Sequence, residues 1–595
     1  MKKHIIIIAA VATLTLTACN DFLTKEDPNK IDAPSFFRNE TDLKNYANGF
    51  IQTMIPSADN IATGDIHADY MSWRGQWTFL TDKYNADDQG SWSWSQLRNI
   101  NYFLSNFKRA NCSEALKKHY EGTGRFWRAY FYFNKVKTFG AVPWYDFVLE
   151  NDDYTNLYKE RDNREDVMHH VLEDISYAAD NCITNAALEV NSVQITKYVA
   201  LAMKARICLF EGTYRKYHST DPSTGESWKN NESEMYLREC ANACEKLMKS
   251  GRYNIINNPE KVETQYRELF TSESVNTTEC IWARAYSAAL NTTHTLNSKF
   301  VVQQYGSYAL NKQFINTYLN QDGTRFTDKP GYDKVQFADE FKNRDYRLTQ
   351  TIRHPGYKRN NNGTATPQAP NFNCSATGYQ PIKWVIDDMG LDSNTSPCNS
   401  SIPIIRYAEI LLNYAEAKCE LGEFTESIWN QTIRPLRERA GVSGTMPTTS
   451  DAYMAEYFLN TVTDGNLLEI RRERGIELVM ENLRWDDDMR WAMGHLLDRV
   501  WYGIYVPAMN QLYDMDGDGI PDVSFVSSEP SPTVKGVQYR IIGTDFTLTE
   551  GTSGYLNVYP TLERKWNDKK YLRPIPTTAL NSNPALGQNP GWTNK

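Results

Sequence analysis

The chain has 595 residues and a formal net charge of −9, and 41% of its residues are hydrophobic. This length is enough for a large core and for more than one domain. The absence of any basic block argues against nucleic acid as a partner, because nucleic-acid binders need a positive surface. Aromatic residues are numerous, with 36 Tyr, 24 Phe and 15 Trp. These are more than a core needs, and tryptophan can also serve at a binding surface.

The first element is typical of a secretory signal. A basic start (MKKH) is followed by a short apolar run from Ile5 to Leu16 and then by Leu16-Thr17-Ala18-Cys19. The run is too short to cross a bilayer, and the stretch resembles a bacterial lipobox. We therefore expect residues 1–18 to be a lipoprotein signal peptide and the Cys19 thiol to carry lipid. Several acyl chains on one residue anchor a protein more stably than a single chain.

Apolar residues recur at helical spacing in seven later segments, which predicts a mostly α-helical protein. In GRFWRAYFYFNKVKTFG, for example, Phe126, Ala129 and Phe133 fall on one stripe, and Gly140 ends the pattern. Paired helices of this length favour a tetratricopeptide-like scaffold, because such pairs bury their apolar faces only by stacking. The predicted helices are 94–139, 163–182, 195–212, 236–249, 406–422, 425–440 and 466–493.

The remainder of residues 19–595 contains little helical pattern. Scaffold helices fall mainly in 41–250 and 403–495, and they are separated by a loop-rich segment at 251–402. Asn, Thr, Gly, Pro and Ser are dense within that segment, as is typical of irregular structure. Residues 496–595 are predicted to form turns and a few short strands. We expect one body, with the helices as scaffold and a large loop-rich subdomain packed against them.

Several motifs together resemble the SusD/RagB-like outer-membrane lipoproteins of Bacteroidetes. They run in order along nearly the whole mature chain, and the last is the most specific: CNDFL (19–23), FWRAYFYFNKVKTFGAVPW (126–144), IRYAEILLNYAEAKCELG (405–422), RRERGIELVMENLRWDDDMRW (471–491) and YLRPIPTTALNSNPALGQNPGW (571–592). The sequence departs from the family at Trp592, where a tyrosine is common, and in an individual insertion at 505–560.

The resemblance implies a nutrient-binding lipoprotein that is anchored in the outer membrane by acylated Cys19 and faces the cell exterior. Such proteins capture oligo- or polysaccharide and pass it to a SusC-like TonB-dependent transporter, without catalysis. Two alternatives remain open, because a fold does not fix the ligand. One is a peptide-binding RagB-type member, and the other is a tetratricopeptide scaffold that binds no small ligand. A glycoside hydrolase is a third possibility that needs a test.

Residues 65–94 hold the predicted ligand contacts. Sugar recognition needs flat aromatic rings beside polar groups, and this segment offers both just before the first long helix. We expect Trp94 to be a core residue, because it lies where that helix begins. The predicted glycan contacts from this segment are Asp65, Trp73, Arg74, Trp77, Tyr84 and Trp92. A weaker cluster in the loop-rich middle adds Trp282 and Tyr286.

The stretch DMDGDGIPD (514–522) predicts a structural calcium site. Carboxylates alternate as in a DxDxDG loop, and Gly519 stands at the sharp turn. Charges packed so closely repel one another unless a cation joins them. Phe525 occupies the position of the usual bidentate glutamate, so a further ligand must come from elsewhere. The predicted ligands are Asp514, Asp516, Asp518, Asp522 and the carbonyl of Ile520.

Three glutamates, Glu473, Glu477 and Glu481, recur every four residues and invite comparison with glycosidase carboxylates. An internal ion-pair network is the better interpretation, because four arginines lie close by in the sequence. These are Arg471, Arg472, Arg474 and Arg484. Among the cysteines, Cys240 and Cys244 are predicted to face the core. Cys374 and Cys398 could form a disulfide, which the sequence alone does not decide.

Overall fold

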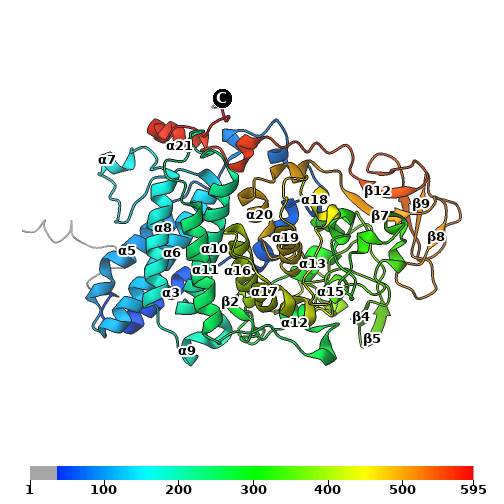
Figure 1. Cartoon of the computed structure of the whole chain (residues 1–595), viewed down its shortest axis with the longest axis horizontal. Coiled ribbons are helices and arrows are strands. Elements are labelled where there is room, and N and C mark those ends of the chain that lie inside the picture. Colours follow the sequence, from blue (N-terminus) through cyan, green and yellow to red (C-terminus); the bar gives the residue numbers. More distant parts are fainter. Residues whose placement is uncertain (1–35, 594–595) are drawn as a thin grey trace, which may run out of the picture.

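A computed structural model describes residues 36–593. The predicted signal peptide and Cys19 lie outside this range. Long helices gather on one side of the molecule, and strands and loops form the other side (Figure 1). The mostly α-helical class with few short strands is confirmed. None of the helices within 36–593 combines the length and apolarity needed to cross a membrane.

The helices of the first half are α3 (Glu40–Met54), α4 (Ala58–Ala62), α5 (Ser95–Asn106), α6 (Glu114–Phe139), α7 (Tyr154–Leu157), α8 (Arg164–Asn181), α9 (Ala186–Glu189), α10 (Lys197–Tyr217), α11 (Ser233–Lys249), α12 (Gln265–Thr271) and α13 (Leu296–Val301). Those of the second half are α14 (Lys312–Ile315), α15 (Tyr346–Thr351), α16 (Tyr407–Glu420), α17 (Glu426–Arg439), α18 (Ala452–Tyr457), α19 (Gly465–Glu477), α20 (Arg484–Arg490) and α21 (Thr577–Ser582).

Two of the predicted helices are each divided into two. The segment 94–139 forms α5 and α6, because the Ser113 hydroxyl caps a new helix by accepting the Leu116 amide. The segment 466–493 forms α19 and α20, and between them Met480 and Asn482 have positive φ angles of 60° and 62°. A helix cannot continue through such left-handed residues. Apolar spacing continued across both breaks and therefore hid them.

The long helices pack in succession. Helix α6 packs on α8, α8 on α10, α10 on α11, and α11 on α16, which in turn packs on α17 and α19. The second helical block therefore continues the stack begun by the first, although a long loop-rich segment separates them in sequence (Figure 1). Cys240 and Cys244 face the core of this stack, as predicted. Cys374 and Cys398 are buried free thiols and form no disulfide with each other.

The strands are short and form small sheets. They are β1 (Met71–Ser72), β2 (Cys280–Arg284), β3 (Ala309–Leu310), β4 (Lys358–Asn361), β5 (Thr364–Pro367), β6 (Ile402–Arg406), β7 (Tyr502–Val506), β8 (Leu512–Tyr513), β9 (Val523–Val526), β10 (Gln538–Ile541), β11 (Phe546–Leu548) and β12 (Gly554–Val558). Antiparallel pairs join β1 to β3, β2 to β6 and β4 to β5. The larger sheets run β11-β12-β7, which is antiparallel, and β10-β9-β8, in which β10 and β9 are parallel.

The N-terminal aromatic segment meets the C-terminal segment in a second, smaller core. Phe79 and Leu80 pack there with Trp566, Tyr571 and Trp592. The backbone carbonyl of Leu80 accepts the amide of Lys565 at 2.8 Å, which ties the two segments together. In Figure 1 the C-terminal segment (red) lies beside the N-terminal loops (blue). This junction positions the predicted ligand residues.

Candidate functional site

Asp65 is a structural residue, which corrects its assignment as a ligand contact. It is 1% exposed, and its carboxylate accepts the backbone amides of Asn482 (2.9 Å) and Arg484 (3.0 Å) and the Tyr70 hydroxyl (2.8 Å). Burial raises the pKa of Asp65 to about 6 despite these hydrogen bonds. The side chain therefore fastens the aromatic segment to the turn between α19 and α20.

Trp73 and Trp77 lie half-buried on either side of His67. The imidazole stacks on Trp77 at 3.7 Å and meets the edge of Trp73 at 5.0 Å. Burial, followed by the charge of Arg573, lowers the pKa of His67 to about 3, so this ring is neutral at ordinary pH. The cavity between these rings measures about 20 Å³, too small to admit a sugar ring. Arg74 beside them is exposed, so ligand contact here would be confined to the outer edges of the indoles.

Trp92 lines a much larger cavity of about 600 Å³, which we call the Trp92 pocket. The pocket lies between the start of α5, the loop that precedes α7, and α21. Trp92 meets the edges of Trp94 at 5.4 Å and Phe139 at 4.9 Å, so its orientation is held by neighbouring rings. The lining includes Trp92, Trp94, Asn101, Tyr145, Phe147 and Asn583. Trp94 is therefore half-exposed at a cavity, rather than the buried core residue that its helical position predicted.

Asn101 gives the Trp92 pocket a polar group that the sequence did not predict. Its amide nitrogen donates to the carbonyls of Tyr145 (3.0 Å) and Phe147 (2.8 Å) and so shapes the wall. Its amide oxygen is buried and has no hydrogen-bond partner among the described residues. A buried acceptor without a donor is costly, and a hydroxyl group entering the pocket would satisfy it. At the rim, Arg98 lies 3.6 Å from Glu150.

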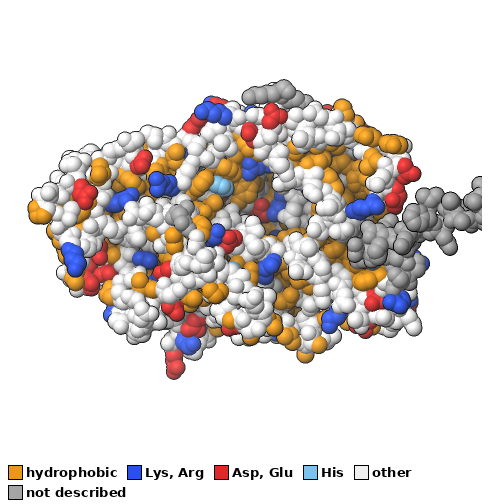
Figure 2. All heavy atoms as spheres, turned by 180° about the vertical axis from the view of Figure 1, so that it is seen from behind, with side chains coloured by type: hydrophobic (Ala, Val, Ile, Leu, Met, Phe, Trp, Pro, Cys, Tyr) orange, Lys and Arg blue, Asp and Glu red, His pale blue; other side chains and the backbone are white. Residues whose placement is uncertain are grey.

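Tyr84 lines a second cavity of about 440 Å³, which we call the Arg573 pocket. Its hydroxyl donates to Gln89 at 2.6 Å. The lining includes Tyr84, Ser91, Asn134, Lys137, Trp485 and Arg573. The two pockets lie close together, because Ser91 lines this one and the next residue, Trp92, lines the other. The face of the molecule seen from behind is hollowed, with hydrophobic side chains in the hollows and basic side chains near them (Figure 2).

Trp282 and Tyr286 are core residues, which corrects the second predicted cluster. Trp282 is fully buried on β2, packs against Trp127 and donates to the Val193 carbonyl at 3.3 Å. Tyr286 is 8% exposed, and its hydroxyl accepts the amide of Ala58. The sequence placed these residues in loops. The structure instead forms a buried strand there, because β2 pairs with β6 against the helical stack.

The carboxylates that resemble glycosidase residues are fully engaged. Glu473 pairs with Arg347 and Arg437, whereas Glu477 pairs with Arg347, Arg406 and Arg439. Glu481 pairs with Lys383 and Arg406. The internal network was therefore predicted correctly, but its partners were not. The four arginines close in sequence point elsewhere, and their own partners are Glu420 for Arg471, Asp451 for Arg472, Asp487 for Arg474 and Asp69 for Arg484.

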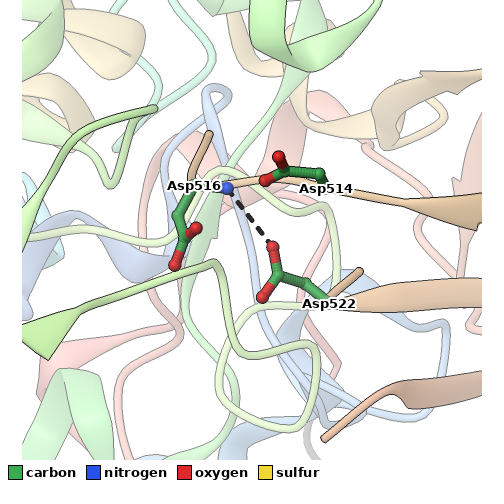
Figure 3. Close-up of side chains that lie close together, drawn as sticks. All are labelled: Asp514, Asp516 and Asp522. Atoms are coloured by element: carbon green, nitrogen blue, oxygen red, sulfur yellow. Dashed lines mark hydrogen bonds between the residues drawn. The ribbon is translucent and has the colours of Figure 1, made fainter. Parts of the chain in front are cut away.

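Three of the five predicted calcium ligands come together in the loop between β8 and β9. Asp514, Asp516 and Asp522 each offer one oxygen, and these oxygens lie within 4.8 Å of one another (Figure 3). Burial, followed by the neighbouring carboxylates, raises the pKa of Asp522 to about 6. Asp518 does not join this group, and its carboxylate accepts the Ile520 amide at 2.7 Å. Ile520 is 62% exposed.

Apart from Trp92, Trp94 and Tyr84, the residues of the two pockets carry no distinctive sequence signal. Tyr145 and Phe147 follow the end of α6 in an ordinary loop, and Trp485 is the second residue of α20. Arg573 belongs to the LRPIP motif, where the sequence indicates a turn and not a binding residue. These side chains meet only because the C-terminal segment folds back over residues 79–95.

Two family models match the chain. One, described as the SusD family, covers residues 278–592, and the other, described as starch-binding and associating with the outer membrane, covers 21–209. A SusD-like protein P2 from Formosa agariphila is 23% identical over 83% of this chain and 92% of its own. A SusD-like protein from Bacteroides ovatus is 21% identical over 97% and 99%. The crystal structure of a SusD-like carbohydrate-binding protein from Bacteroides fragilis superposes with a TM-score of 0.67 at 21% identity, covering 93% of this chain and all of that one.

Proposed function

The chain belongs to the SusD family, and from this premise we propose that it captures oligo- or polysaccharide at the outer membrane. The glycan then passes to a SusC-like TonB-dependent transporter, with no bond broken. The Trp92 pocket is the observation that carries this proposal. Its volume of about 600 Å³ falls within the usual range for small-ligand sites. Its aromatic rings suit the apolar faces of a sugar, and the free acceptor on Asn101 suits a hydroxyl group.

Binding without catalysis is favoured because Glu473, Glu477 and Glu481 are held in ion pairs. The glutamates that suggested a hydrolase are buried and paired with basic residues. A hydrolase needs one carboxylate to donate a proton and another to attack or to activate water, and carboxylates held in such a network can do neither. Reducing ends accumulating when the purified protein is incubated with a polysaccharide panel would contradict this part of the proposal.

The test of glycan capture is a glycan array, followed by affinity gel electrophoresis on a soluble 20–595 fragment. We expect binding to at least one glycan class, and Trp92→Ala should weaken it by about fivefold, because a stacked ring is worth about 1 kcal/mol. Tyr154→Ala is the matched control, since this exposed ring lies outside the pocket lining. An empty array together with binding to a peptide library would favour the peptide-binding alternative.

Trp73→Ala and Trp77→Ala address the other predicted indoles. The small cavity between those rings leaves only edge contacts, so we expect a smaller loss of affinity than for Trp92→Ala. A larger loss at Trp73 would move the glycan site to the surface that carries Arg74. The comparison shows whether the sugar binds in the Trp92 pocket or on the surface that carries Arg74.

Membrane attachment is proposed to occur through lipid on Cys19. The family model that covers residues 21–209 is described as associating with the outer membrane, which supports this location. Replacement by Cys19→Ser should release the protein from the outer-membrane fraction, and a protease added to whole cells should degrade the wild-type protein. Co-purification of a transporter barrel after detergent extraction tests the proposed partner.

We also propose that the loop 514–522 binds calcium in a structural role. Asp514, Asp516 and Asp522 supply hard oxygen ligands, the kind that calcium prefers. Because a cation offsets the repulsion among these carboxylates, it would hold the loop between β8 and β9 in one conformation.

A further inference from the structure

Arg573 lies in the second cavity inside a cage of aromatic rings. The carbon at the centre of its guanidinium is 3.3 Å from the centroid of Phe79 and 5.3 Å from that of Trp77. The rings of Tyr84 and Trp485 lie slightly farther away, at 5.8 and 5.9 Å. Stacking of this kind fixes the plane of the guanidinium and leaves its N–H edge for a further partner. The side chain is therefore oriented before any ligand arrives.

The charge of Arg573 is not neutralised by any carboxylate of the described residues. No carboxylate among residues 36–593 forms an ion pair with this half-buried side chain, although most of the buried arginines in that range have one. Burial lowers the pKa of Arg573 to about 10, and the Tyr84 hydroxyl only partly opposes this shift. A desolvated cation without a counter-ion is unfavourable, so an anion that reached it would gain binding energy.

A second unpaired cation lies in the same cavity. Lys570 is almost fully buried and donates to the backbone carbonyls of Lys565 (2.6 Å) and Thr81 (3.3 Å), but it forms no ion pair with a described carboxylate. Lys137 also lines the cavity and is balanced by Asp486 at 2.5 Å. The lining therefore carries an excess of positive charge in a chain whose net charge is −9.

The loop at residues 89–95 connects the charged cavity to the aromatic one. Ser91 has a positive φ of 68°, and its carbonyl accepts the Lys135 ammonium at 2.6 Å. This turn places Ser91 in the Arg573 pocket and Trp92 in the Trp92 pocket. A ligand with a neutral ring and an acidic group could therefore engage both.

We propose that the Arg573 pocket binds the acidic group, a carboxylate or a sulfate ester, of a glycan held in the Trp92 pocket. The proposal rests on the glycan-binding function above and narrows it to acidic glycans. The guanidinium edge matches the paired oxygens of either group, and Lys570 adds a second charge. Asn134 in the lining donates one amide hydrogen to the Tyr130 carbonyl and has a second one to offer the ligand.

The test compares the wild-type protein with Arg573→Gln on an array that contains neutral, uronate and sulfated glycans. The glycans bound by the wild type should carry acidic groups, and Arg573→Gln should weaken them by about tenfold or more, as expected for a charge-assisted contact. Separate uronate and sulfate spots identify which acidic group is recognised. Arg573→Lys keeps the positive charge but loses the planar guanidinium, so it should retain part of the affinity. The difference between the two variants measures how much of the affinity comes from the charge alone.

Arg238→Gln is the matched control, because it removes one positive charge from an exposed ion pair on α11. Its array pattern should equal that of the wild type. If the wild type binds only neutral glycans and Arg573→Gln binds them equally well, this inference is wrong and the proposed function stands. If the wild type binds no glycan of any class, both are wrong. Thermal unfolding of each variant shows that a loss of binding does not come from a loss of fold.

Discussion

Arg406 is buried and Arg573 is half-buried, and the surroundings of the two guanidinium groups differ. The guanidinium of Arg406 donates to Glu279 (2.6 Å), Glu477 (3.0 Å) and Glu481 (2.7 Å), so all of its charge is used within the fold. Arg573 is held by aromatic rings and has no carboxylate partner in the described chain. The first arrangement joins β6, α19 and the segment before β2. The second leaves a charge available to a ligand.

The difference separates residues that hold the fold from residues that can bind. A buried cation with several carboxylates cannot be removed without leaving those carboxylates short of positive charge. A cation that faces a cavity leaves nothing behind when it is removed. Replacing Arg406 should therefore lower the free energy of unfolding strongly, whereas replacing Arg573 should change it little. Ligand affinity should depend on Arg573 and not on Arg406.

The largest expected effect follows from Arg406→Gln. The variant leaves Glu279, Glu477 and Glu481 facing one another without their shared cation, which should cost about 3–5 kcal/mol of unfolding free energy. Urea unfolding followed by tryptophan fluorescence measures this loss. Arg238→Gln, on the exposed face of α11, should leave the midpoint unchanged, because exposed pairs contribute little. A small effect for Arg406→Gln would mean that the network is not needed for the fold.

Acid should weaken the same network. Burial alone would raise the pKa of Glu477, but Arg439, Arg406 and Arg347 outweigh it and hold the pKa below the ordinary value of 4.5. The carboxylate therefore contributes stability that is present above pH 4.5 and is lost as the pH falls through the lower, folded-state pKa. Each unit of such a shift is worth about 1.4 kcal/mol. Urea midpoints measured from pH 6 to pH 3 should fall steeply for the wild type and less for Arg406→Gln.

Much of the scaffold could be predicted from the sequence, because helix periodicity and capping are local. The seven helical segments were found, but their internal breaks at Ser113 and at the left-handed residues Met480 and Asn482 were missed. Helix α3 was not among the predicted segments, and α10 extends beyond the predicted end at residue 212. The existence of an internal ion-pair network was also predictable, because glutamates at four-residue spacing share a helix face. Its partners were not predictable, because Arg347, Arg406 and Arg439 come from distant segments.

The candidate site was predictable only in part. A cluster of indoles shows that rings are plentiful, but not which of them face a cavity: Trp92 does, whereas Trp282 lies in a buried strand. The role of Arg573 could not be predicted from the sequence for a different reason. What sets it apart from Arg406 is that no carboxylate of residues 36–593 pairs with it, and that depends on how the C-terminal segment packs over residues 79–95.

Calcium should produce an intermediate effect. If the loop 514–522 binds it, calcium at a hundred times its dissociation constant should stabilise the protein by about 2.7 kcal/mol in a reversible unfolding experiment. The effect should fade as the pH drops below 6, because Asp522, whose pKa is raised to about 6, must lose its proton to bind the ion. Asp516→Asn should abolish the response. Equal stabilisation by magnesium would indicate a general charge effect and not a calcium site.

The smallest change in stability is expected for Arg573→Gln. This variant loses a stacking contact with Phe79, worth about 1 kcal/mol or less, but it also removes a partly desolvated charge that no carboxylate of residues 36–593 balances. The two terms oppose each other, so its urea midpoint should stay close to that of the wild type, in contrast to Arg406→Gln. A loss as large as that of Arg406→Gln would place Arg573 among the structural arginines. Its effect on acidic glycans would then be a consequence of unfolding, because a side chain that the fold requires cannot be assigned to a ligand from binding data alone.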